Sequence, residues 1–136
     1  MHKRCSCGHT MTLILRTLIY VHKVSIANVP VYSCEFCSRN EVFPGVKEDL
    51  GQLVGRMGSK PQPQTIPFEE QHEWAAVLRD MAANRQPLDA AAVARSIENR
   101  TNELLDLLLV ASSLRDEKWQ KELRGRLSQL SAQYIS

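Results

Sequence analysis

The first third of the chain alternates between apolar and polar positions in the manner of β-strands. Between Met11 and Val31 the residues are rich in Leu, Ile, Val, Thr and Tyr, and one side of the first stretch is apolar, with Met11, Leu13, Leu15, Ile19 and Val21. This pattern predicts an antiparallel hairpin or meander that turns near His22 and Lys23. Because Pro30 has no N–H to donate, we expect the returning strand to be an edge strand or to be bulged at that position.

The pattern changes after residue 40. A short strand is expected at 41–43, where Pro44 and Gly45 end it, and a short amphipathic helix at 47–57. The segment 59–67 contains three prolines and no periodicity, which predicts a semi-extended linker. We therefore divide the chain into a β-rich module (1–58), a linker (59–67) and a helical domain (68–136).

Apolar positions recur at helical spacing in the last part. We expect helices over 68–84 and from the N-cap Asp89 to about Ser112, followed by a third helix that begins near Ser113. The predicted fold class is thus α+β: a small zinc-ribbon-like β module followed by a three-helix region. Neighbouring helices of this kind form an antiparallel hairpin, and three form a small bundle.

The second of these helices is apolar nearly all round in its C-terminal half, with Leu104, Leu105, Leu107, Leu108, Leu109 and Val110. A unit of about seventy residues has few surfaces on which to hide all of them. They are buried either within one chain or against a second copy. We expect residues 68–136 to form a homodimer.

Composition places the chain among globular proteins, with 136 residues, 43% apolar and 24% charged. The apolar run from Met11 to Val21 is interrupted by Arg16 and is too short to span a bilayer. The start Met1-His2-Lys3-Arg4 leads into a cysteine-glycine turn rather than an apolar signal region. We expect a cytoplasmic protein with no membrane contact.

The four cysteines form two close pairs, Cys5-x-Cys7 and Cys34-x-x-Cys37, separated by the predicted strands. Two such turns brought together by a hairpin are typical of a structural zinc site with four thiolate ligands. Cys5-x-Cys7 is one residue shorter than the usual spacing, so His9 or His2 is an alternative to Cys5. Two disulfides and a redox pair are competing uses, but a reducing cytosol disfavours the first and no thioredoxin-like pattern surrounds the second.

Other chemistry has weaker support. His72-Glu73 begins like a metalloprotease helix, but Ala76 occupies the position of the second histidine, so we interpret His72 as a solvated helix residue. Gly51, Gly55 and Gly58 lack the lysine-serine order of a phosphate loop. We expect no enzyme activity.

The N-terminal segment, residues 1 to about 58, resembles the YgiT-type zinc-finger domain of MqsA-type antitoxins. The resemblance rests on a cysteine knuckle at the start, a β-meander, the run Ile26-Ala27-Asn28-Val29-Pro30-Val31-Tyr32-Ser33-Cys34 that leads into Cys-x-x-Cys, and a short helix after it. It implies that Cys5, Cys7, Cys34 and Cys37 bind zinc and that this module holds a protein partner. The antitoxins' DNA-binding helix-turn-helix has no counterpart in the second half of this chain.

These observations predict a zinc-binding regulatory or adaptor protein that acts through protein contacts and dimerises through its helices. The alternative is a nucleic-acid-binding regulator. Its basic face would consist of Lys3, Arg4, Arg16, Lys23 and Arg39, with Tyr20 and Tyr32 as stacking platforms. Residues 1–60 carry eight Lys/Arg and four Asp/Glu, so their charge of +4 falls to about +2 with zinc on four thiolates.

Overall fold

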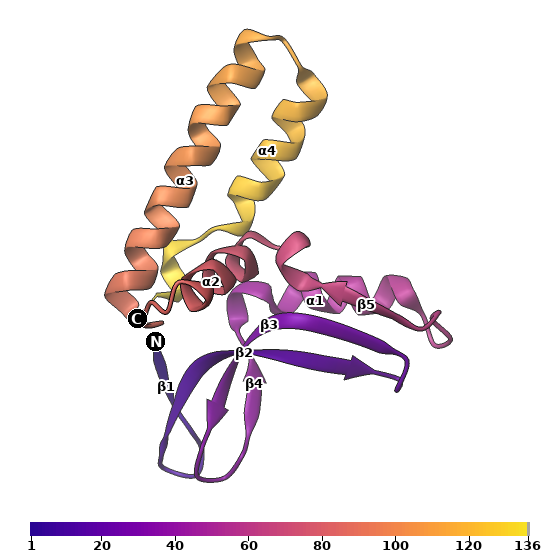
Figure 1. Cartoon of the computed structure of the whole chain (residues 1–136), viewed down its shortest axis with the longest axis vertical. Helices are drawn as coiled ribbons and strands as arrows, with labels where there is room; N and C mark the ends of the chain where they lie inside the picture. Colours follow the sequence, from indigo (N-terminus) through magenta and orange to yellow (C-terminus); the bar gives the residue numbers. More distant parts are fainter. Residues whose placement is uncertain (136) are drawn as a thin grey trace.

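A computed structural model describes residues 1–135. The predicted α+β class is confirmed, because a curled antiparallel sheet in the N-terminal part is followed by helices (Figure 1). Within the described residues, no helix is long and apolar enough to cross a membrane.

The sheet has the order β1-β2-β3-β4, with antiparallel neighbours throughout this path. Its strands are β1 (His2–Arg4), β2 (Thr10–Tyr20), β3 (Val24–Cys34) and β4 (Asn40–Val42). The β2–β3 hairpin turns through residues 21–23, as the sequence predicts. Pairing of Met11 with Cys34 places the β1–β2 and β3–β4 loops at the same end of the sheet (Figure 1).

Pro30 does not lie on an edge strand, so that alternative is wrong. β3 is central, with β2 on one side and two successive partners on the other: β5 (Gln64–Pro67) along residues 24–27 and β4 along residues 31–33. Pro30 falls where one partner ends and the next begins, and there its carbonyl accepts from the Phe43 N–H (3.0 Å). A proline is tolerated at this point because neither neighbour needs its missing donor. The returning strand is bulged two to three residues before Pro30, because Ala27 and Asn28 of β3 face the single residue Thr17 of β2, and Asn28 has a positive φ of 60°.

The predicted linker at 59–67 is wrong in its second half. Residues Gln64–Pro67 form β5, which pairs in parallel with the start of β3, and the Gln64 N–H donates to the Lys23 carbonyl (3.2 Å). Only the prolines of this segment lack an N–H group. Gln64, Thr65 and Ile66 retain theirs, and these suffice for a short ladder of hydrogen bonds between strands. This strand therefore ties the second part of the chain to the sheet.

The helices are α1 (Pro44–Met57), α2 (Glu73–Ala83), α3 (Ala90–Ser113) and α4 (Glu117–Gln129), with 3₁₀ turns η1 (Phe68–Glu70) and η2 (Ala132–Tyr134). The helix predicted over 68–84 is interrupted, because the His72 ring accepts from the Trp74 N–H and caps a new helix at Glu73. Asp89 caps α3 as predicted (2.8 Å to the Ala92 N–H). Asp116 caps α4, so the third helix begins after Ser113.

The predicted three-helix bundle does not form, because α2 packs into the core of the sheet. Trp74 and Leu78 are fully buried there, and the Trp74 ring meets Phe43 edge-on at 4.9 Å. Gly45 permits this packing, since a Cβ at that position would lie 2.6 Å from the Phe43 ring. We call residues 1–83, which share this core, the body.

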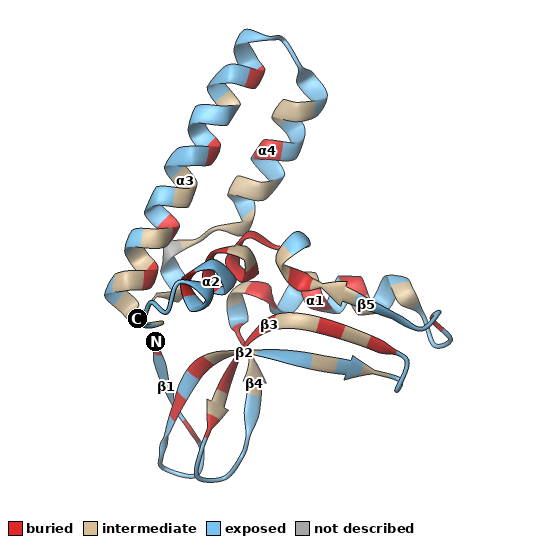
Figure 2. Cartoon of the chain, viewed as in Figure 1, coloured by how far each residue is buried: buried red, intermediate tan, exposed pale blue. Residues whose placement is uncertain are grey.

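The helices α3 and α4 form an antiparallel hairpin, residues 90–129, that extends away from the sheet (Figure 1). The hairpin has a narrow seam in which Leu104, Ala111 and Leu123 are buried and Leu108 is half-buried. Figure 2 shows the buried positions spaced along the inner side of both helices, with exposed positions around them. After α4 the chain returns to the body, where the Tyr134 ring lies 5.9 Å from Phe43.

Candidate metal centre

The two cysteine pairs lie on turns that are closed by equivalent backbone hydrogen bonds, with one more residue enclosed in the second turn. In the first, the Gly8 N–H donates to the Cys5 carbonyl (3.0 Å) and the Cys5 N–H donates to the His9 carbonyl (2.8 Å). In the second turn, the Ser38 N–H donates to the Cys34 carbonyl (2.9 Å) and the Cys34 N–H donates to the Arg39 carbonyl (2.9 Å). The residue that follows each second cysteine has positive φ: +94° at Gly8 and +61° at Ser38. Glycine signals the first turn in the sequence, whereas serine gives no such signal.

The structure brings all four cysteine sulfurs, the predicted site residues, within 4.8 Å of one another. The Cys5 and Cys37 sulfurs are 3.5 Å apart, and those of Cys7 and Cys34 are 3.6 Å apart. A tetrahedral zinc ion with Zn–S bonds of about 2.3 Å requires sulfur–sulfur edges of about 3.8 Å. A disulfide requires about 2.05 Å. The spacing therefore fits four ligands around one metal ion.

Neither His9 nor His2 is better placed than Cys5 to act as the fourth metal ligand. The Cys5 sulfur lies within the cluster and is buried, whereas His9 contacts only the Cys7 sulfur, through Nδ1 at 3.6 Å. His2 lies in β1 opposite Thr12, on an exposed position. The short Cys5-x-Cys7 spacing thus still places both sulfurs in one cluster.

The acidity of the thiols shows why this cluster suits a cation. A hydrogen bond from the Cys7 backbone lowers the pKa of Cys5 to about 7 despite its burial. The His9 backbone likewise acts to lower the pKa of Cys7, but burial and the neighbouring thiols outweigh it and raise that pKa to about 12. One thiol therefore loses its proton readily, and deprotonation of a second thiol is disfavoured because two negative charges would lie close together. A divalent cation bound among the sulfurs would offset this repulsion.

An exposed aromatic pair adjoins the cysteines. The rings of His9 and Phe36 stack with centroids 3.8 Å apart, and Phe36 is 70% exposed. They border a surface depression of about 440 Å³ that Thr10, Thr12 and Glu35 also line. Sequence reasoning did not reveal this pair, because its two residues belong to different turns.

The interpretation of His72 as a solvated residue is wrong. His72 is only 2% exposed, and its Nε2 lies 2.8 Å from the Asp49 carboxylate on α1. Nδ1 accepts from the Trp74 N–H, so the neutral ring carries its proton on Nε2, toward Asp49. Burial lowers the pKa of His72, and Asp49 opposes this effect in part. The ring joins α1 to the start of α2.

A second polar cluster joins the body to the hairpin. Glu73 is 5% exposed; it accepts from Nε and Nη2 of Arg100 on α3 (2.7 and 3.1 Å) and from Nε of Arg126 on α4 (2.6 Å). Burial acts to raise the pKa of Glu73, but hydrogen bonds from the two arginines outweigh it and lower the pKa below its ordinary value. Separations of 27 and 53 residues explain why the sequence pattern did not reveal this cluster.

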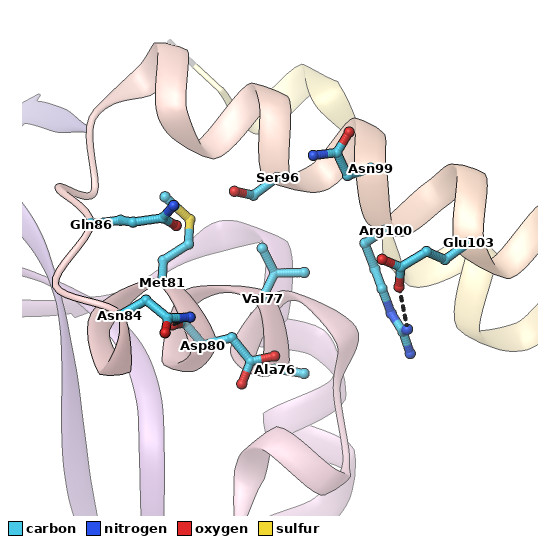
Figure 3. A pocket seen from close by; sticks show the side chains of 10 residues that line it. All are labelled: Ala76, Val77, Asp80, Met81, Asn84, Gln86, Ser96, Asn99, Arg100 and Glu103. Carbon is cyan, nitrogen blue, oxygen red and sulfur yellow. Dashed lines mark hydrogen bonds and ion pairs between the residues drawn. The ribbon is translucent and has the colours of Figure 1, made fainter.

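A pocket of about 290 Å³ lies between α2 and α3 (Figure 3). Arg100 at its edge is paired with Glu103 (3.0 Å), and the other polar side chains that line it are Asp80, Asn84, Gln86, Ser96 and Asn99. No histidine or cysteine lines it. The cysteine cluster and the aromatic pair lie elsewhere.

The comparisons with known proteins give no relative. No protein-family model, curated protein or solved structure matches the chain.

Proposed function

We propose that this protein is a non-enzymatic zinc-binding regulatory or adaptor protein that acts through protein contacts. Zn²⁺ on Cys5, Cys7, Cys34 and Cys37 fixes the end of the sheet, in a module related to the YgiT-type zinc finger. Zinc fits the donor set best, because four soft thiolates with tetrahedral spacing are its characteristic structural site. Four protein ligands leave no coordination position for a reacting water, which supports a structural role.

The observation that carries the proposal is the exposed apolar surface of the hairpin. Leu109 is 70% and Leu114 67% exposed, and Leu105, Leu107 and Val110 are also exposed on the same helix. They form two exposed apolar stripes along one helix, and exposed apolar surface of this kind on a folded protein marks an interaction site. We call these five side chains the outer leucine face. The body holds the hairpin by its base, so this face is presented to a partner.

The proposal is tested by capturing partners of the intact, zinc-loaded protein from its native cell, with and without nuclease. We expect a nuclease-resistant protein partner that the Leu109→Glu variant loses. Ile19→Glu is the matched control, because Ile19 is an aliphatic residue on the β2–β3 hairpin that is 60% exposed. Loss of all captured protein on nuclease treatment would contradict the proposal.

The aromatic pair favours a second candidate function, single-stranded nucleic-acid binding. Phe36 offers an exposed ring for base stacking, and Arg4 lies on the adjacent strand, opposite Thr10 at the rim of the depression. Lys3 contributes less, because it is paired with Glu41. Fluorescence anisotropy with short oligonucleotides tests this function: Phe36→Ala should lower affinity for every sequence, and an affinity independent of salt would argue against it.

A further inference from the structure

We infer that the occupant of the outer leucine face is a second copy of this chain, and that two hairpins pack into a four-helix bundle. The inference rests on the proposed role of the hairpin as an interaction surface and names its partner. It starts from the geometry of α3 and α4, which beyond Arg100 bury one narrow seam between them.

The helical positions of the outer leucine face show why one chain leaves it uncovered. Leu107, Val110 and Leu114 follow one another at i, i+3 and i+7, which is the spacing of a second helix-packing stripe. Leu105 and Leu109, at i and i+4, lie on the opposite flank of the seam. The seam residues Leu104, Leu108 and Ala111 lie between these flanks and face α4. Another layer of helices is what such flanks normally pack against.

The body of the same chain does not supply that layer. α2 reaches the hairpin only near its base, where Glu73 binds Arg100 and Arg126. The outer leucine face begins beyond Arg100 and extends to the end of α3, in the part that projects from the sheet (Figure 2). The face therefore stays exposed unless a separate molecule covers it.

Charge favours a second copy over an unrelated helix. Past residue 97 the exposed charged residues of α3 are all acidic: Glu98, Glu103 and Asp106. The exposed surface of α4 carries three basic residues, Lys118, Lys121 and Arg124, against two acidic ones. Within residues 1–135, neither Asp106 nor these three basic side chains take part in an ion pair. Placing α4 of one copy beside α3 of the other brings opposite charges together along an apolar stripe, which is the arrangement of a specific helical bundle.

The dimensions are also those of a small dimer interface. α4 has 13 residues and so spans about 20 Å, and two helices side by side are about 20 Å wide. Two faces of this size cover roughly 800 Å² of surface in total, which is in the range of weak, transient interfaces. We expect a reversible dimer whose dissociation constant lies in the micromolar range.

Sedimentation of the zinc-loaded full chain from 1 to 100 µM tests the inference. The wild type should approach twice its 15.4 kDa mass as concentration rises. Leu109→Glu should remain monomeric throughout, and Ile19→Glu should dimerise like the wild type. Both positions are exposed, so circular dichroism should show unchanged folding. Leu108→Glu is a poor test, because Leu108 packs in the seam.

A charge exchange makes the test specific for α3–α4 contacts between copies. Asp106→Lys and Lys121→Glu should each weaken dimerisation at least three-fold, and the double variant should recover part of the loss. A wild type that stays monomeric at 100 µM overturns the inference, as does a Leu109→Glu variant that still dimerises. If the wild type is monomeric and Leu109→Glu still loses a captured protein, the adaptor function stands and only the choice of partner is wrong.

Discussion

The body and the hairpin use their apolar residues in different ways. In the body, Trp74, Phe43 and Phe68 are buried together with both faces of the central strand, and the core receives buried residues from β2, from β3 and from both of its helices. In the hairpin, Val93 and Ile97 at the base of α3 join the core of the body, and beyond Arg100 the fully buried residues are Leu104, Ala111 and Leu123. The body is thus stabilised from within one chain. The hairpin is held at its base and carries apolar surface outward.

Metal removal should have the largest effect, because the sheet end that holds the cysteines has little other core. Structural zinc contributes about 10–16 kcal/mol of apparent binding free energy in small domains. We expect near-stoichiometric zinc by elemental analysis, and loss of the sheet's amide protection after chelation or in Cys34→Ser, with α3 and α4 retaining helicity. Ser33→Ala is the neighbouring control. A metal-free protein with full sheet protection would falsify the structural zinc site.

Trp74→Ala should destabilise the whole body. Trp74 is fully buried between α1 and the sheet, and removing a buried tryptophan costs about 3–5 kcal/mol. Trp119 on α4 provides the matched control, because it is half-buried and packs only against the hairpin seam. Urea unfolding should show a clearly smaller loss for Trp119→Ala, and hydrogen exchange should confine that loss to α3 and α4. Equal losses would show that body and hairpin unfold as one unit.

Glu73→Gln should loosen the hairpin from the body at a cost of about 1–3 kcal/mol, reduced from the full value for a buried pair because Arg126 is partly exposed. The pKa of Glu73 is lower in the folded state than its ordinary value of 4.5. Its contribution to stability is therefore present above pH 4.5 and lost as pH falls through the lower folded value. The stability difference between wild type and Glu73→Gln should shrink below pH 4.5. A difference independent of pH would show that the carboxylate charge is not what holds the hairpin.

His72→Asn should have the smallest effect and should act through pH. The folded-state pKa of His72 lies below the ordinary 6.5, so the unfolded chain binds the extra proton first and wild-type stability falls as pH drops below 6.5. Asparagine can still cap α2 but does not titrate. The fall in stability below pH 6.5, about 1 kcal/mol or less in the wild type, should therefore be absent from the His72→Asn variant. Thermal melts of both proteins between pH 8 and pH 6 measure this, and parallel profiles would contradict it.

Local signals in the sequence determined the strands, the caps and the cysteine turns. Alternation from Met11 to Val21, the N-cap Asp89 and the paired cysteines with Gly8 each depend on residues a few positions apart, and such short-range preferences survive in the fold. Together they also predicted the α+β class. The cysteine spacing indicated one metal site, and the structure brings the four sulfurs together.

Tertiary packing alone decided the features that join distant segments. β5 pairs with β3 although its proline-rich sequence resembles a linker, because a buried strand edge gains a partner. His72 is buried only because Asp49 on α1 lies opposite its ring, and Glu73 only because two arginines meet it. The sequence predicted that the second half of α3 is apolar nearly all round. In the fold, α4 covers one stripe of this surface, the seam, and leaves an exposed apolar flank on either side of it. None of these pairings is encoded at short range, since burial of a polar or apolar side chain depends on what the whole fold places against it.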